Sequence, residues 1–168
     1  MEIITNLDKF PRTDAGCVLT IGNFDGLHLG HQEIIKSAGN FAQRKSLPLY
    51  AMTFDPPPLF VLRGEKRPPQ ITVPVVKMKL IEEIGLVTGM IMIKPDMKFL
   101  GMTPREFAWN ILVEKLNIKF IVEGQTFNFG ARGSGTIVTL RELGQEFGFE
   151  TYMTPSCKIR CTTDGETA

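Results

Sequence analysis

The sequence predicts an α/β fold built on a doubly wound, Rossmann-like parallel sheet of about five strands, in one domain. Two observations predict it. Short apolar runs typical of strands alternate with stretches whose apolar residues recur every three or four positions, as in amphipathic helices. A glycine-rich segment, Gly22–His31, separates the first run from the first helical stretch. Strands separated by helices pair in parallel through right-handed crossovers, and such a sheet binds its ligand at the carboxyl ends of its strands.

The first half of the chain predicts three strands and two helices. We expect the strands at 18–22, 47–54 and 90–93. The first helix follows from apolar residues at helical spacing, namely Leu29, Ile34, Ile35, Ala38, Phe41 and Ala42. Thr72 and Pro74 indicate the start of the second helix and Gly85 its end, because proline suits the first helical position. We assign its inner face to Val76, Leu80 and Ile84. Residues 55–69 are expected to form a Pro-rich loop.

The second half predicts two helices and two strands. A capping box, Thr103-Pro-Arg-Glu106, begins a helix whose inward residues are Phe107, Ile111, Leu112 and Leu116. We expect strands at 118–122 and 149–153, with a glycine-rich loop at 125–135 after the first of them. Between that loop and the last strand, Leu140, Leu143 and Phe147 mark a helix that ends at Gly148.

Composition limits the function classes. The chain has 168 residues, which suits one domain, and 19 basic against 18 acidic residues. A net charge of +1 argues against a nucleic-acid partner, and no apolar run reaches the roughly 20 residues of a membrane span. The segment 1–12 alternates charged and apolar residues, unlike a signal peptide. Cys17, Cys157 and Cys161 form no CxxC pair, so we expect no disulfide framework and a cytoplasmic protein.

The segment Gly22–His31 is the strongest functional signal. It lies where a strand meets a helix N-terminus, whose free N–H groups and dipole favour a phosphate. Its glycines let the backbone approach a ligand closely. His28 and His31 are three residues apart, so both imidazoles should project from one face of the first turn. Two such donors suit phosphoryl chemistry, in which charge stabilisation dominates.

Simpler explanations of these residues stay open. The two histidines also fit a solvated helix start, and a metal pair is a third option, although Cys17 is the one soft ligand nearby. We therefore predict no metal site in the protein itself. Phe54 and Phe129 also fit the core, and Asp55 also fits a turn before proline.

Three motifs resemble one family. Thr20-Ile-Gly-Asn-Phe-Asp-Gly-Leu-His-Leu-Gly-His31 resembles the first nucleotide-binding motif of bacterial bifunctional riboflavin kinase/FMN adenylyltransferases. Thr53-Phe-Asp-Pro-Pro-Pro58 resembles that family's FDPHP loop, and Gly124-Gln-Thr-Phe-Asn-Phe-Gly130 resembles its G-x-[DN]-F-x-F-G loop. The resemblance implies a nucleotidyltransferase-type fold and an enzyme that joins AMP from ATP to FMN, giving FAD and pyrophosphate.

The resemblance also implies roles for individual residues. His28 and His31 would be catalytic, holding the ATP phosphates and stabilising charge at the α-phosphate. The ATP loop would be shaped by Gly22, Asn23, Phe24, Asp25 and Gly30. FMN would be bound by Phe54, Asp55, Pro56, Pro58, Thr126, Phe127 and Phe129. Mg²⁺ would enter with ATP, and the domain would normally be fused to a riboflavin kinase domain. Because both flavin loops follow predicted strands, they should emerge at one edge of the sheet.

The sequence departs from the family in several places. Pro57 replaces the histidine of FDPHP, and Thr126 replaces the Asp or Asn of the third motif. Ser156-Cys-Lys-Ile-Arg160 matches the family's SSTxxR motif only loosely, and 163–168 fits the turn before that motif better. We therefore expect a domain truncated at its C-terminus, without the kinase domain. Two alternatives remain: a flavin- and nucleotide-binding fragment with little turnover, and another HxGH nucleotidyltransferase that acts on a nicotinamide or pantetheine nucleotide.

Overall fold

The computed structural model describes residues 1–64 and 69–155, and its centre is a six-stranded sheet in which every pairing is parallel. The strand order is β1-β4-β3-β2-β5-β8. The strands are β1 (Glu2–Ile4), β2 (Cys17–Ile21), β3 (Leu49–Phe54), β4 (Gly89–Ile93), β5 (Ile118–Gly124) and β8 (Glu150–Thr154). The predicted α/β, Rossmann-like fold and all five expected strands are confirmed. The sixth strand, β1, escaped prediction because it has three residues and buries only Ile4.

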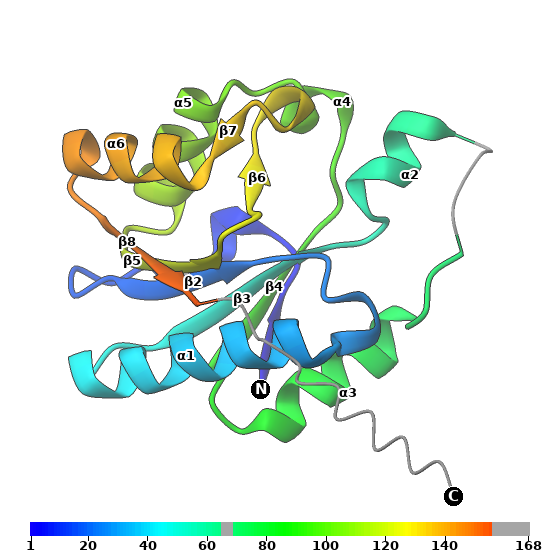
Figure 1. Ribbon diagram of the computed structural model, residues 1–168, viewed down its shortest axis with the longest axis horizontal. Helices are drawn as coiled ribbons and strands as arrows, with labels where there is room; N and C mark the ends of the chain where they lie inside the picture. The colour runs from blue at the N-terminus through cyan, green and yellow to red at the C-terminus, as the bar shows by residue number, and fades with distance from the viewer. Residues whose placement is uncertain (65–68, 156–168) are drawn as a thin grey trace, which may run out of the picture.

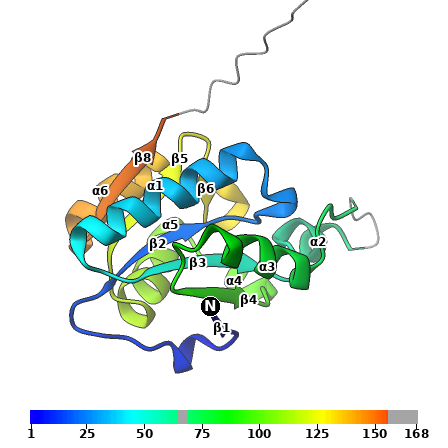
Figure 2. The same cartoon turned by 90° about the horizontal axis from the view of Figure 1, so that it is seen from below.

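Helices cover both faces of the sheet (Figure 1). One face carries α1 (Leu29–Lys45) and α3 (Pro74–Ile84), which Figure 2 shows from below. The other face carries α5 (Pro104–Phe107), its π-helical continuation η3 (Ala108–Lys115) and α6 (Ile137–Phe147). The chain crosses from one side of β2 to the other between β4 and β5, so the strand order reverses there. This is the position at which open α/β sheets bind ligands.

The expected helix ends are confirmed. Thr103 and Glu106 form the capping box of α5, and Gly85 and Gly148 end α3 and α6 in the left-handed conformation. The expected inward residues of the α5–η3 segment are all buried; they are Phe107, Ile111, Leu112 and Leu116.

Three expectations need correction. The Pro-rich loop contains a short helix, α2 (Pro58–Arg63), because proline at the first helical position fixes a helical φ. The glycine-rich loop contains a small antiparallel ladder between β6 (Asn128–Phe129) and β7 (Gly135–Thr136). On α3 the fully buried residues are Lys77 and Ile81, whereas Val76 is 44% exposed, so our predicted inner face was wrong at Val76.

The remaining elements of the described residues are short. They are α4 (Met97–Leu100) and the 3₁₀ turns η1 (Leu7–Lys9), η2 (Asp25–Leu27) and η4 (Ala131–Gly133). Within the described ranges, no helix has the length and apolarity to span a membrane. Cys17 is a buried free thiol whose pKa is raised by burial to about 12, whereas Cys157 and Cys161 lie outside the described residues.

Candidate active site at the carboxyl edge of the sheet

The glycine-rich segment Gly22–His31 leaves β2, forms the turn η2 and enters α1. Gly26 has a φ of 70°, which disfavours any side chain, and a Cβ there would lie 3.4 Å from Ile71. At Gly30, a Cβ would lie 3.2 Å from the ring of His28. The backbone conformation therefore favours glycine at position 26, whereas at position 30 a side chain would crowd the His28 ring.

The two imidazoles lie together, as the sequence predicted. His28 is the N-cap of α1, and its Nδ1 accepts a hydrogen bond from the His31 backbone N–H at 3.4 Å. The two rings stack with centroids 3.6 Å apart and an interplanar angle of 23°. His31 also contacts the edge of Phe24 at a centroid distance of 5.5 Å. Both rings thus lie at a helix N-terminus, which favours anions.

His31 is neutral near pH 7. Burial lowers its pKa to about 4, with a further lowering by the charge of His28. Its Nδ1 is buried and has no hydrogen-bond partner among the described residues. A neutral imidazole can donate a hydrogen bond through one ring nitrogen and accept one through the other. The pair can therefore exchange both hydrogen bonds and protons with an entering phosphate.

Asp25 has a structural role in the loop. Its carboxylate accepts hydrogen bonds from the backbone N–H of Ile71 at 3.0 Å, and from the N–H and hydroxyl of Thr72 at 2.8 and 2.9 Å. Although partial burial acts in the opposite direction, these hydrogen bonds lower the pKa of Asp25. Asp25 thereby fastens the glycine-rich segment to the chain that enters α3.

The other residues expected to bind ATP lie in the same segment. The Phe24 side chain is 1% exposed and packs in the core, so any contact it makes with a nucleotide is through its backbone. Asn23 is exposed, and its carbonyl accepts a hydrogen bond from the Thr53 hydroxyl at 3.2 Å. Gly22 follows β2 directly, and its N–H donates to the Met52 carbonyl of β3.

The second motif loop, the first of the two expected to bind flavin, begins where β3 ends. Phe54 is half-buried there, and the Asp55 N–H donates to the Ile93 carbonyl at 2.9 Å. Pro56 follows Asp55 through a cis peptide bond, and Pro58 is the first residue of α2.

The third loop follows β5, and aromatic contacts link it to the second. The ring centroids of Phe54 and Phe99 lie 6.0 Å apart. The Phe107 ring follows, with its centroid 5.8 Å from that of Phe99 and 5.8 Å from that of Phe129. Phe129 and Phe127 are stacked, with centroids 5.7 Å apart. The two loops, more than seventy positions apart in sequence, therefore emerge at the same edge, as predicted.

The rings of the third loop differ in exposure. Phe129 is 7% exposed and packs in the core, whereas Phe127 is only partly buried and Thr126 is exposed. Phe127 therefore offers more surface to a flavin, and a direct contact by Phe129 stays a prediction.

Sequence analysis missed two residues beside these loops. Lys77 is 3% exposed, and its Nζ donates to the Thr53 hydroxyl at 3.3 Å. Glu123 is 2% exposed, and its Oε1 accepts from the Ile21 N–H at 2.6 Å. Burial raises the pKa of Glu123 well above its ordinary value. Both residues were missed because buried positions were predicted from apolar residues alone. The available signal was a charged residue at a position where the apolar pattern of α3 or β5 predicts burial.

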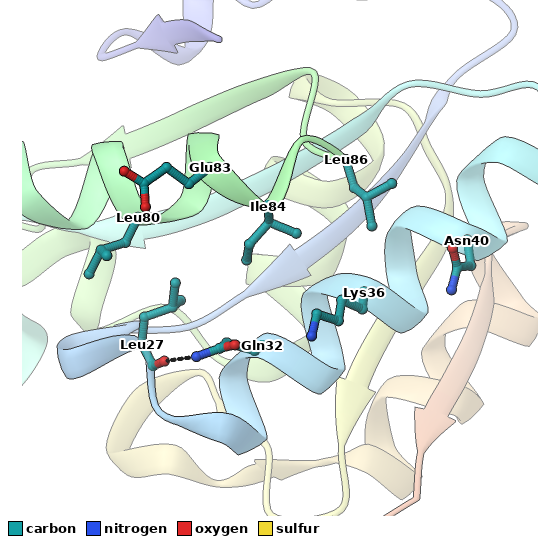
Figure 3. Close-up of a pocket in the computed structure, with 8 residues that line it drawn as sticks. All are labelled: Leu27, Gln32, Lys36, Asn40, Leu80, Glu83, Ile84 and Leu86. Carbon is teal, nitrogen blue, oxygen red and sulfur yellow. Dashed lines mark hydrogen bonds between the residues drawn. The ribbon is translucent and has the colours of Figure 1, made fainter.

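A cavity of about 620 Å³ lies elsewhere, between α1 and α3 (Figure 3). Leu27, Leu80 and Ile84 form its apolar part, and the Gln32 amide donates to the Leu27 carbonyl at 2.9 Å. It contains none of the predicted site residues. The imidazoles and the partly exposed aromatic rings lie in the three motif loops instead.

Ser156–Arg160 and 163–168, the two segments compared with the family's SSTxxR motif, lie outside the described residues. Among the residues that are described, no group of three or more His, Cys, Asp or Glu side chains is placed to hold a metal ion.

Curated bacterial proteins are similar to most of this chain. The bifunctional riboflavin kinase/FMN adenylyltransferase of Escherichia coli (strain K12) is 35% identical over 147 residues, covering 88% of this chain and 46% of the relative. The protein of the same name from Bacillus subtilis (strain 168) is 35% identical over 127 residues, covering 75% of this chain and 40% of the relative. The chain thus spans about half the length of the curated relatives it matches.

A solved structure agrees in fold. A protein from Streptococcus pneumoniae described as a macrolide-efflux protein superimposes with a TM-score of 0.78 at 24% identity, covering 95% of this chain and 52% of that one. At this identity the likeness supports the fold alone. A model of the FAD synthetase family matches residues 10–165. Because that match includes all three loops and nearly the whole chain, the chain belongs to the FAD synthetase family.

Proposed function

We propose that this chain is an FMN adenylyltransferase, which transfers AMP from ATP to FMN and gives FAD and pyrophosphate. The observation that carries the proposal is the meeting of three motif loops at one sheet edge, after β2, β3 and β5. The first loop offers two imidazoles at a helix N-terminus, and the other two offer aromatic rings. This combination suits a triphosphate beside a planar, phosphorylated ligand.

The reaction needs no covalent intermediate on the protein. A phosphate oxygen of FMN attacks the α-phosphorus of ATP, and the bond from that phosphorus to the bridging oxygen of the β-phosphate breaks. Pyrophosphate leaves with the electron pair of that bond. His28 and His31 would stabilise the charge on the phosphoryl oxygens, together with the first N–H groups of α1. Mg²⁺ would arrive as part of the MgATP substrate and neutralise phosphate charge.

The flavin would lie between the second and third loops. Phe54 and Phe127 are both partly buried and lie at opposite ends of the aromatic contacts that join these loops. We place the isoalloxazine ring against Phe54 or Phe127, in the orientation that brings its phosphate toward the glycine-rich segment. The proposal concerns adenylyl transfer alone and assigns no riboflavin kinase activity to these residues.

The test is FAD formation from FMN and MgATP, measured by chromatography, with pyrophosphate release in the same samples. We expect His28→Ala and His31→Ala each to lower turnover by about 10²- to 10³-fold, the usual effect of removing one charge-stabilising donor. Asn40→Ala, at an exposed position on the same helix, is the matched control and should keep normal turnover.

Two results would contradict the proposal. Binding of FMN and ATP without FAD formation would indicate a binding fragment. Turnover with a nicotinamide or pantetheine nucleotide in place of FMN would indicate another nucleotidyltransferase. Normal turnover in the His28/His31 double variant would remove the catalytic assignment even if FAD forms.

A further inference from the structure

Lys77 is a buried cation at the junction of two of the motif loops. Lysine is almost never fully buried unless its charge is paired, yet Lys77 is 3% exposed. Its Nζ donates to the Thr53 hydroxyl at 3.3 Å, and that hydroxyl donates to the Asn23 carbonyl at 3.2 Å. One ammonium group is therefore linked through Thr53 to both the end of β3 and the glycine-rich segment.

The charges around Lys77 come from the same two loops. Burial lowers the pKa of Lys77, and the carboxylates of Asp25 and Asp55 act in the opposite direction. Asp25 belongs to the glycine-rich segment and Asp55 to the loop after β3. The positive charge of Lys77 also contributes to the low pKa of His31. The ammonium makes its hydrogen bond to Thr53, and its charge acts electrostatically on both carboxylates and on a proposed catalytic imidazole.

We propose that Lys77 is a positioning residue that offsets the charges of Asp25 and Asp55 where the substrate phosphates meet, and that fixes the two loops relative to each other through Thr53. This inference rests on the proposed function. ATP and FMN both bring negative phosphates to this edge. Two uncompensated carboxylates in a partly buried site would repel these phosphates, because charges interact strongly where water is excluded. Lysine suits the role as a compact cation with three donors.

The test compares three variants in the whole chain. Lys77→Met keeps the length of the side chain but removes its charge, Lys77→Arg keeps the charge, and Lys79→Met removes an exposed charge from the same helix. The primary measurement is the Kd of MgATP by titration calorimetry without FMN. Steady-state kinetics then gives KM for each substrate and kcat separately, and circular dichroism checks the fold.

We expect Lys77→Met to raise the Kd of MgATP and the KM of FMN by about 10- to 100-fold, with Lys77→Arg within about fivefold of the parent and Lys79→Met unchanged. Adding Asp55→Asn to Lys77→Met should recover part of the lost ATP affinity, which a purely structural role would not produce. If Lys77→Met does not fold, Lys77→Gln replaces it, because glutamine is also neutral but keeps a hydrogen-bond donor.

Parent-like ATP affinity in the neutral variants would overturn the inference. Equal losses in Lys77→Arg and Lys77→Met would also overturn it, because charge would then be irrelevant. If the parent chain binds MgATP but makes no FAD, the proposed function fails, and the ATP titrations still decide the role of Lys77.

Discussion

His28 and His31 occupy different environments although their rings are stacked. His28 is exposed and caps α1, whereas His31 is partly buried against Phe24, and its Nδ1 has no hydrogen-bond partner within residues 1–64 and 69–155. Desolvation disfavours the charged form of a buried imidazole. Burial therefore holds the inner ring, His31, in its neutral form near pH 7.

The pKa of His31 gives a pH prediction. It is about 4 in the folded protein, against an ordinary value of 6.5. Between these values the unfolded chain binds a proton that the folded chain does not, so the contribution of His31 to stability is lost as pH falls from 6.5 to 4. We expect the free energy of unfolding of the parent, relative to His31→Gln, to fall by about 1–2 kcal/mol across this window, allowing for solvent screening of a partly exposed ring.

Urea unfolding at several pH values between 4 and 7.5 measures this difference. The variant cancels the contributions of Asp25 and Glu123, which titrate in both proteins. Stability curves that run parallel for the parent and His31→Gln would show that the ring titrates normally.

At the scale of elements, apolar periodicity predicted the positions of the long helices and strands and missed short ones. It located α1, because many apolar residues share its inner face. It failed for β1 and α2, whose three and six residues are too few to show a period. It failed at Lys77, because a buried charge stabilised by hydrogen bonding and neighbouring carboxylates looks like an exposed one in sequence. The position of each flavin loop directly after a predicted strand predicted their shared edge of the sheet, whereas the exposure of each ring depends on packing between distant segments.

The difference in exposure between Phe127 and Phe129 predicts different effects of truncation. Phe127→Ala should weaken FMN binding by roughly 1–3 kcal/mol, the scale of aromatic stacking on a base, with little loss of stability. Phe129→Ala should lower the free energy of unfolding by about 3–5 kcal/mol, because it empties a core position. Quenching of FMN fluorescence gives the affinity, and urea unfolding gives the stability. A fully stable Phe129→Ala that loses FMN binding would instead make Phe129 the flavin-contacting ring.

At the scale of the whole molecule, the reversal of strand order brings the proposed substrates together. The loop after β3 belongs to the half of the sheet that contains β4 and β1, and the loop after β5 belongs to the half that contains β8. The glycine-rich segment follows β2, between them. A ligand that spans these loops contacts both halves, so its binding should stabilise the fold as one unit.

This arrangement predicts the response of thermal unfolding to ligands. At 100 times its Kd, a ligand that binds only the folded protein adds about 2.7 kcal/mol of stability. For a chain of this size, that raises Tm by roughly 5–10 °C. We expect MgATP and FMN each to produce such a shift in a single transition, and EDTA to reduce the shift caused by ATP and leave the FMN shift in place, because Mg²⁺ enters with the nucleotide. Differential scanning calorimetry measures the Tm shift with MgATP, the shift with FMN, and the effect of EDTA on each. Absence of an FMN shift would argue against the flavin site, and an ATP shift that EDTA does not change would show that the nucleotide binds without its metal.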